Sequence, residues 1–274
     1  NYMLKQAIIP LAGLGTRLLP LSSITPKELL PVNGKSNLEH ILDECIEAGI
    51  KEFIFVISKR KENIKKYFFN DQFYKSILNK KKDKRIGDVL KKLKKYQKMI
   101  KFVYQNKPKG TGDAILKCKK HIKESHFLML FPDDLIIKKN CSKEMIALYK
   151  KTKSSIIATK TVKKKEVSRY GILSLKNKKK NYFTIKDVVE KPSLNHAPSN
   201  YAIIGRYILP TTIMSKLKNL KPGQGGEIHI TDAIRKLITS GEKFYGNIFK
   251  GKYLDCGTLE GYINSSIQMS KEKK

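Results

Sequence analysis

The sequence predicts an α/β fold in which helices flank a mixed, mostly parallel sheet, and three observations support this prediction. Residues 6–12 form a largely apolar run, which is typical of a strand buried on both faces. Apolar residues then recur at a helical spacing over 38–48, with Gly49 at the end of the pattern, and a second apolar run covers 52–57. A strand, a helix and a strand of this length form a right-handed βαβ unit almost by default.

The rest of the chain adds strands and helices in a more mixed order. Residues 59–99 are mostly helical and highly charged, which indicates an excursion over the surface. Further strands are expected at 100–104, 126–131, 154–161, 182–189, 200–208, 244–249 and 252–255, and further helices at 112–122, 232–238 and 259–269. This order predicts one doubly wound, Rossmann-like domain over residues 1–274, with a small peripheral elaboration on the substrate side.

The charge balance of the 274 residues is strongly basic. Lys and Arg number 57 against 24 Asp and Glu, a formal net charge of +33. A basic nucleic-acid-binding protein is therefore the non-enzyme alternative. It predicts clustered Arg and aromatic stacking platforms, whereas only six of the basic residues are Arg and the lysines are scattered. We expect no nucleic-acid partner and attribute the excess of Lys to codon bias, with steering of an anionic substrate as the open alternative.

The cysteine residues and the lengths of the apolar runs indicate the cellular compartment. The cysteines at 45, 118, 141 and 256 form no Cys-x-x-Cys pair and have no histidine at metal-ligand spacing, so free thiols in a reducing cytoplasm are expected. No apolar run approaches the roughly 20 residues of a membrane span, and no leader with a cleavage site opens the chain. We expect a cytoplasmic protein without a membrane partner.

A glycine loop follows the first strand. Gly13 and Gly15 let backbone amides approach a phosphate without obstruction by side chains. A dinucleotide fingerprint needs a third glycine where Leu18 stands, and no P-loop lysine follows. Arg17 and Lys27 supply two cations nearby, and prolines on both sides of Lys27 fix its backbone. We interpret the loop as a polyphosphate site, with an ordinary turn as the alternative.

Acidic residues follow two strands that lie far apart in the sequence. Asp133 and Asp134 come after the strand at 126–131, and Asp255 ends the strand at 252–255. Ligands of open α/β sheets bind outside the carboxyl ends of strands. Two carboxylates that converge there suit Mg²⁺, which accepts one or two carboxylates together with phosphates and water. Turn or cap aspartates are the alternative.

An acid and a base are adjacent at the end of another strand, where Glu190 and Lys191 precede Pro192. Neighbouring strand residues point to opposite faces, so a bend at Pro192 is needed to bring both into a cleft. A solvated pair is the alternative.

Two glycine turns carry weaker signals. The turn 110–112, after Gln105, and the turn 225–232 each precede a helix, where free amides can meet a base or an anion. An ordinary helix start explains each turn about as well.

Taken in order, these segments resemble the bacterial UTP–glucose-1-phosphate uridylyltransferases of the sugar-nucleotidyltransferase superfamily. The Gly-x-Gly-Thr-Arg loop alone indicates only the superfamily. The segments 197–200 and 226–233 favour the uridylyltransferases over the related thymidylyltransferases. The resembling stretches, which together span residues 6–268, are 9–20, 26–32, 44–50, 110–114, 132–134, 170–171, 189–192, 197–207, 226–233 and 255–257.

The resemblance implies an enzyme that transfers a uridylyl group from UTP to glucose 1-phosphate, with Mg²⁺ as cofactor. Attack on the α-phosphorus is in line, releases pyrophosphate and needs no general base. The resemblance places the peripheral elaboration on the sugar side and implies a homodimer or homotetramer. A thymidylyltransferase that uses dTTP is the alternative enzyme.

The resemblance also implies a role for each site residue. It assigns uracil to Ala12, Gly13, Gln105 and Gly110, and the triphosphate to Gly15, Thr16, Arg17 and Lys27. It assigns Mg²⁺ to Asp133 and Asp255, the glucosyl hydroxyls to Asp134, Gly171 and Glu190, and the sugar phosphate to Lys191, with Tyr170 and Glu227 as further lining residues. Arg17, Lys27 and Lys191 are the implied catalytic cations.

Overall fold

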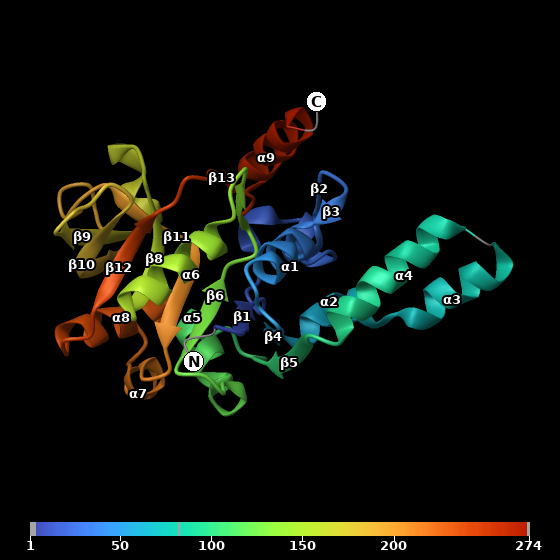
Figure 1. Ribbon diagram of the computed structural model, residues 1–274, viewed down its shortest axis with the longest axis horizontal. Helices are drawn as coiled ribbons and strands as arrows, with labels where there is room; N and C mark the ends of the chain where they lie inside the picture. The colour runs from blue at the N-terminus through green and yellow to red at the C-terminus, as the bar shows by residue number, and fades with distance from the viewer. Residues whose placement is uncertain (1–3, 82, 273–274) are drawn as a thin grey trace.

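A nine-stranded sheet runs through the middle of the protein (Figure 1). The computed structural model describes residues 4–81 and 83–272. In spatial order the strands are β5 (Ile100–Tyr104), β4 (Glu52–Ile57), β1 (Gln6–Pro10), β6 (His126–Leu130), β11 (Tyr201–Pro210), β8 (Ser155–Thr161), β12 (Phe244–Ile248), β10 (Tyr182–Glu190) and β9 (Gly171–Lys176).

The two sides of the sheet differ in strand direction. On one side β5, β4, β1 and β6 are all parallel. On the other side β11 is antiparallel to β6 and β8, and β10 is antiparallel to β12 and β9, while β12 and β8 are parallel. The predicted mixed α/β sheet is confirmed, but the expectation that it is mostly parallel is wrong. The chain joins β9 to β10 and β10 to β11 without a crossover helix, and parallel neighbours need such a crossover.

Helices cover both faces of the sheet, because the strands bury side chains on both faces. In β4, Phe53 and Phe55 belong to one core, whereas Ile54 and Val56 belong to the other. The first core takes residues from α1 (Asn37–Glu47), α6 (Cys141–Thr152) and α9 (Leu259–Lys271), and the second from α5 (Thr111–Lys117), α7 (Ile213–Lys218) and α8 (Ile230–Thr239). No helix among the described residues is both long and apolar enough to cross a membrane.

The charged excursion predicted at 59–99 is helical. It forms α2 (Glu62–Phe69), α3 (Asp71–Lys80) and α4 (Lys84–Gln97), and α3 and α4 extend away from the sheet as an arm (Figure 1). α3 buries none of its side chains, whereas α4 buries Leu90, Leu93 and Tyr96.

Two small sheets complete the fold. β2 (Pro31–Val32) pairs with β3 (Lys35–Ser36), and β13 (Lys252–Asp255) pairs with β7 (Asp134–Ile137), both antiparallel. The pairing of β13 with β7 sets Asp255 directly opposite Asp134, so segments more than a hundred residues apart in sequence meet beside the main sheet. The four cysteines are buried and free, as expected.

Candidate active site

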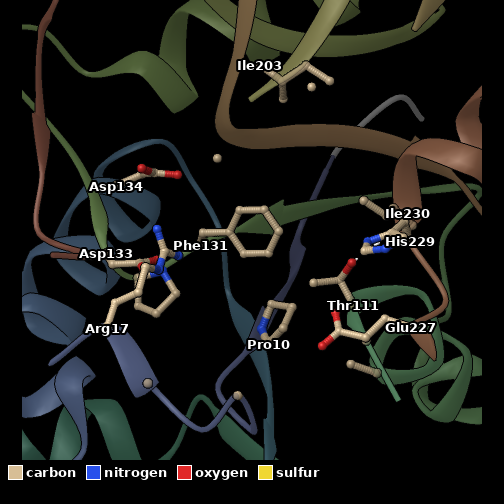
Figure 2. Close-up of a pocket in the computed structure, with 18 of the residues that line it drawn as sticks. Pro10, Arg17, Thr111, Phe131, Asp133, Asp134, Ile203, Glu227, His229 and Ile230 are labelled. Carbon is tan, nitrogen blue, oxygen red and sulfur yellow. Dashed lines mark hydrogen bonds between the residues drawn. The ribbon is translucent and has the colours of Figure 1, made fainter. Parts of the chain in front are cut away.

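A cavity of about 540 Å³ lies where β1 and β6 end. Figure 2 shows Arg17 and Asp133 on one side of the cavity, Thr111 and Glu227 on the other, and Phe131 between them. The structure brings all the predicted site residues to this one cavity. They are Ala12, Gly13, Gly15, Thr16, Arg17, Lys27, Gln105, Gly110, Asp133, Asp134, Tyr170, Gly171, Glu190, Lys191, Glu227 and Asp255.

The glycine loop lines the cavity and has backbone N–H groups without an acceptor in the described part of the chain. Gly15 has a φ of 70°, in the left-handed region that favours glycine, and its carbonyl accepts a hydrogen bond of 2.8 Å from the Ser22 hydroxyl. Among the described residues, none accepts a hydrogen bond from the amides of residues 13–17. Several free N–H groups in a tight loop form a concave site for an anion.

Lys27 points its ammonium at Asp133. The two side chains form an ion pair that is largely shielded from solvent. Burial alone would lower the pKa of Lys27, but the charges of Asp133 and Glu28 outweigh burial and hold that pKa above its ordinary value. Burial opposes ionisation of Asp133, but the charge of Lys27 lowers the pKa of Asp133. Glu28 is itself fixed by Lys61, with N–O distances of 2.7 and 2.9 Å, so the segment that carries Lys27 is anchored.

Asp133 and Asp255 both lie close to Gly257. A Cβ built on Gly257 would be 2.9 Å from Asp133 Oδ2 and 3.2 Å from Asp255 Oδ1, so these oxygens are at most 6.1 Å apart, the sum of the two distances. The Asp133 carbonyl accepts the Cys256 N–H at 2.7 Å, and Asp255 Oδ1 accepts the Gly257 N–H at 2.8 Å. The predicted convergence of two carboxylates from distant strands is confirmed.

Asp134 is half-buried beside these two carboxylates. Its Oδ1 accepts a hydrogen bond of 2.6 Å from the Tyr253 hydroxyl. Burial, together with the charge of Asp133, raises the pKa of Asp134 to about 7, while Tyr253 and Arg206 oppose the rise. A carboxyl with a raised pKa takes up a proton more readily, and in its protonated form it can donate as well as accept a hydrogen bond.

Arg206 and Glu44 hold the Asp134 backbone in place. Arg206 is fully buried in β11, pairs with Glu44 of α1 at 2.7 Å, and donates from Nη1 to the Asp134 carbonyl. This ion pair is a positioning element that sequence reasoning missed. An arginine in the middle of an apolar strand is the signal that could have revealed it, because buried cations require a partner.

On the other side of the cavity, β9 and β10 bring Gly171 opposite Glu190. Glu190 Oε2 accepts a hydrogen bond of 3.0 Å from Thr231, a lining residue that the sequence analysis did not identify. Lys191 has a φ of 43°, and its N–H donates to the Tyr170 carbonyl at 3.0 Å. The bend therefore lies at Lys191 itself, one residue before the predicted Pro192, and it lets Glu190 and Lys191 share one cavity.

Gln105 forms part of the wall near Gly110. Its side-chain Nε2 donates to the Gly110 carbonyl at 3.1 Å and to Asp113 Oδ2 at 2.7 Å. Both neighbours are acceptors, so the orientation of the amide is fixed with its nitrogen toward them. A Cβ on Gly110 would lie 2.7 Å from the Ile228 carbonyl, which explains why a glycine is needed where this chain segment packs so closely.

The comparison with family profiles decides the family. The profile of the nucleotidyl transferase family matches residues 6–272. The chain belongs to this family. It is 35% identical over 274 residues to the UTP–glucose-1-phosphate uridylyltransferase of Bacillus subtilis, covering 98% of this chain and 92% of that protein. It is also 35% identical over 271 residues to the enzyme of that name from Mycoplasma pneumoniae, covering 96% and 91% of the two chains.

Solved structures show the same likeness. A UDP-glucose pyrophosphorylase complexed with UDP-glucose matches this nucleotidyl transferase with a TM-score of 0.87 and 35% identity, over 98% of this chain and 100% of the other. The UTP-bound UGPase from Acinetobacter baumannii matches with a TM-score of 0.87 and 31% identity, over 98% and 94% of the two chains.

Proposed function

We propose that this protein transfers a uridylyl group from UTP to glucose 1-phosphate, giving UDP-glucose and pyrophosphate. One observation carries the proposal: a single cavity combines a loop of free amides, several cations and two carboxylates no more than 6.1 Å apart. The relatives named for this reaction match nearly the whole chain.

The chemistry requires positioning more than acid–base catalysis. A phosphate oxygen of glucose 1-phosphate forms a bond to the α-phosphorus of UTP, and the bond to the pyrophosphate oxygen breaks. The attacking oxygen is already ionised, so no general base is needed. The main obstacle is repulsion between two polyanions, which cations in a partly shielded site reduce.

The basic residues have separate tasks in this reaction. We infer that the amides of residues 13–17, together with Arg17 and Lys27, bind the triphosphate and stabilise the pyrophosphate as it leaves. Lys191, which lines the same cavity, binds the phosphate of glucose 1-phosphate. Separate groups in one cavity thus hold the two substrates, so that the attacking oxygen can be aligned with the α-phosphorus.

Asp133 and Asp255 fit a Mg²⁺ ion. Their oxygen ligands and their separation suit a hard cation that completes its shell with phosphate oxygens and water. Among the described residues, no group of three or more His, Cys, Asp and Glu side chains could hold a metal ion, so phosphate oxygens and water would complete the shell of an ion at Asp133 and Asp255. When bound, Mg²⁺ would neutralise and align phosphate oxygens.

The base and the sugar occupy the two ends of the cavity in this proposal. Because the Gln105 nitrogen is already engaged by two acceptors, its oxygen remains to accept the N3–H of uracil, beside Ala12 and the glycine backbone. The glucosyl hydroxyls are assigned to other residues that line the cavity, which are Asp134, Tyr170, Gly171, Glu190 and Glu227.

Pyrophosphate release tests the proposed function. The protein is incubated with UTP and glucose 1-phosphate, with and without Mg²⁺, and dTTP and galactose 1-phosphate replace each substrate in turn. We expect Mg²⁺-dependent release that is fastest with UTP and glucose 1-phosphate. Faster turnover of dTTP would favour the thymidylyltransferase alternative, and no release with any pair would refute the proposal. The homodimer or homotetramer stays a prediction, which sedimentation can test.

A further inference from the structure

Both carboxylates proposed as metal ligands are paired with basic side chains. Asp133 is paired with Lys27, and Asp255 Oδ2 lies 3.1 Å from Arg169 Nη2. The other oxygen of Asp255 accepts the Gly257 N–H, so both oxygens of this carboxylate are occupied. Two cations of the chain therefore neutralise the acidic pair where a divalent cation would bind. The role of Lys27 follows from the family resemblance, whereas Arg169 has been assigned none.

The position of Arg169 allows its side chain to separate from Asp255. It is the last residue of the short helix Lys164–Arg169, lines the cavity, and is 48% exposed. Its guanidinium lies 5.7 Å from the ring centroid of Tyr170. Asp255 is the only carboxylate among the described residues that pairs with it. Ion pairs this exposed contribute little stability, about 0–1 kcal/mol, so a stronger competitor for Asp255 can separate this one.

The neighbours of Arg169 indicate where it would go. Tyr170 follows it directly, and the Tyr170 carbonyl accepts the N–H of Lys191, the residue assigned to the sugar phosphate. Arg169 and Lys191 therefore lie on two adjacent backbone segments, which this hydrogen bond joins. A guanidinium suits phosphate because it can donate two parallel hydrogen bonds to phosphate oxygens.

We propose that Arg169 is a phosphate-binding residue that serves as the counter-ion of Asp255 in the ligand-free cavity. A divalent cation at Asp255 displaces it, and it then binds the phosphate of the sugar substrate beside Lys191. This inference rests on the proposed function, since it requires that the site binds a sugar phosphate and a metal–nucleotide complex. It predicts opposite effects on two ligands: removing Arg169 strengthens cation binding and weakens sugar-phosphate binding.

The test compares Arg169→Gln with the wild-type protein. Mn²⁺ binding to the nucleotide-free protein, followed by electron paramagnetic resonance, is expected to tighten about two- to fivefold because the competing cation is gone. The KM for glucose 1-phosphate is expected to rise about tenfold or more, since a charge-assisted hydrogen bond is lost, while the KM for UTP changes less than about twofold. Arg169→Lys keeps the charge and is expected to restore most of both properties.

Arg235→Gln is the matched control. Arg235 pairs with Asp187 at 3.0 Å, its side chain is 57% exposed, and neither residue lines the cavity. This substitution removes an ion pair of the same kind and is expected to change neither Mn²⁺ binding nor either KM.

The outcomes separate the possible roles of Arg169. Unchanged Mn²⁺ binding in Arg169→Gln overturns the proposal, as does weaker binding of both Mn²⁺ and glucose 1-phosphate, which indicates a structural role. Absence of pyrophosphate release by the wild-type protein refutes the proposed function instead. The Mn²⁺ measurement uses no substrate, so it still decides whether Arg169 competes for Asp255.

Discussion

The two halves of the sheet build the cavity in different ways. On the parallel side, β1 and β5 lead into backbone amides and into Gln105, a side chain only 4% exposed and fixed by two acceptors. On the antiparallel side, the cavity is lined by long side chains such as Arg169 and Lys191, each about half exposed. The parallel half therefore offers backbone amides and a fixed amide side chain for the proposed nucleotide site, whereas the antiparallel half offers more exposed cations.

Asp133 and Asp255 lie at the junction of these halves. Asp133 follows β6, the last parallel strand, and Asp255 ends β13, which pairs with the segment directly after Asp133. If the junction holds the cation shared by both substrates, substitutions there affect activity more than substitutions in either half.

The largest expected effect is therefore that of Asp133→Asn or Asp255→Asn. Each removes one oxygen ligand charge from the proposed Mg²⁺ site, and we expect kcat/KM to fall about 10³-fold or more, roughly 4 kcal/mol. Steady-state pyrophosphate release measures the loss. Asp187→Asn, which alters a carboxylate of β10 outside the cavity, is the control and is expected to retain activity.

The next effect is on stability. Arg206→Met leaves Glu44 buried without its cation, which we expect to cost about 3–5 kcal/mol in the free energy of unfolding by urea. The double variant Arg206→Met with Glu44→Leu removes both charges and should recover much of that loss. A cost below about 1 kcal/mol for Arg206→Met would show that this buried ion pair does not stabilise the fold as described.

The third effect is the loss of an exposed cation, Lys191, from the antiparallel half. Lys191→Ala should lower the rate about 10²–10³-fold, roughly 3–4 kcal/mol, with the fold intact. Lys186→Ala changes an exposed lysine of β10, the strand that ends directly before Lys191; Lys186 does not line the cavity, and its substitution is expected to leave the rate unchanged. A near-normal rate for Lys191→Ala would remove its role.

The smallest effect concerns Glu39 of α1, which accepts hydrogen bonds from Tyr67 of α2 and Lys92 of α4 beside the parallel half. Burial opposes its ionisation, but hydrogen bonds from Lys92 and Tyr67 outweigh burial and lower the pKa of Glu39. Because the pKa of Glu39 is lower in the folded chain, its ionisation stabilises the fold when the pH is above the pKa of the unfolded chain, near 4.5. This contribution is lost as the pH falls through the pKa of the folded chain.

Glu39→Gln should therefore reduce the free energy of unfolding at pH 7 by about 1–2 kcal/mol. Urea unfolding at several pH values should also show a flatter decline below pH 5 than in the wild-type protein. An unchanged acid limb would mean that Glu39 has the same pKa in the folded and unfolded chain.

The sequence predicted the parallel half well. The strands at 52–57 and 100–104 have the predicted bounds, because strands buried on both faces give continuous apolar runs. The short elements β7 and α7 were not predicted, since four and six residues are too few to show a period. Apart from the pairing of the consecutive strands β9 and β10, strand pairing in the antiparallel half depends on contacts between distant segments, which no local pattern specifies.

The cavity residues were predictable where their chemistry is unusual for their place in the chain. Asp133 and Asp255 stand out as acids at strand ends in a basic chain. Arg169 does not, because nothing in its neighbours indicates that it meets Asp255, 86 residues away. The bend at Lys191 was also placed one residue late, since a left-handed lysine has no sequence signature.

Mn²⁺ binding in the presence of UTP tests the shared cation most directly. It is measured for the wild-type protein, for Asp133→Asn, for Asp255→Asn and for the double variant. One cation held by both carboxylates predicts that each single substitution weakens binding about tenfold or more, and that the double variant is weakened by less than the product of the two. Normal affinity in either single variant, or two effects that simply multiply, would show that the carboxylates do not share one ion.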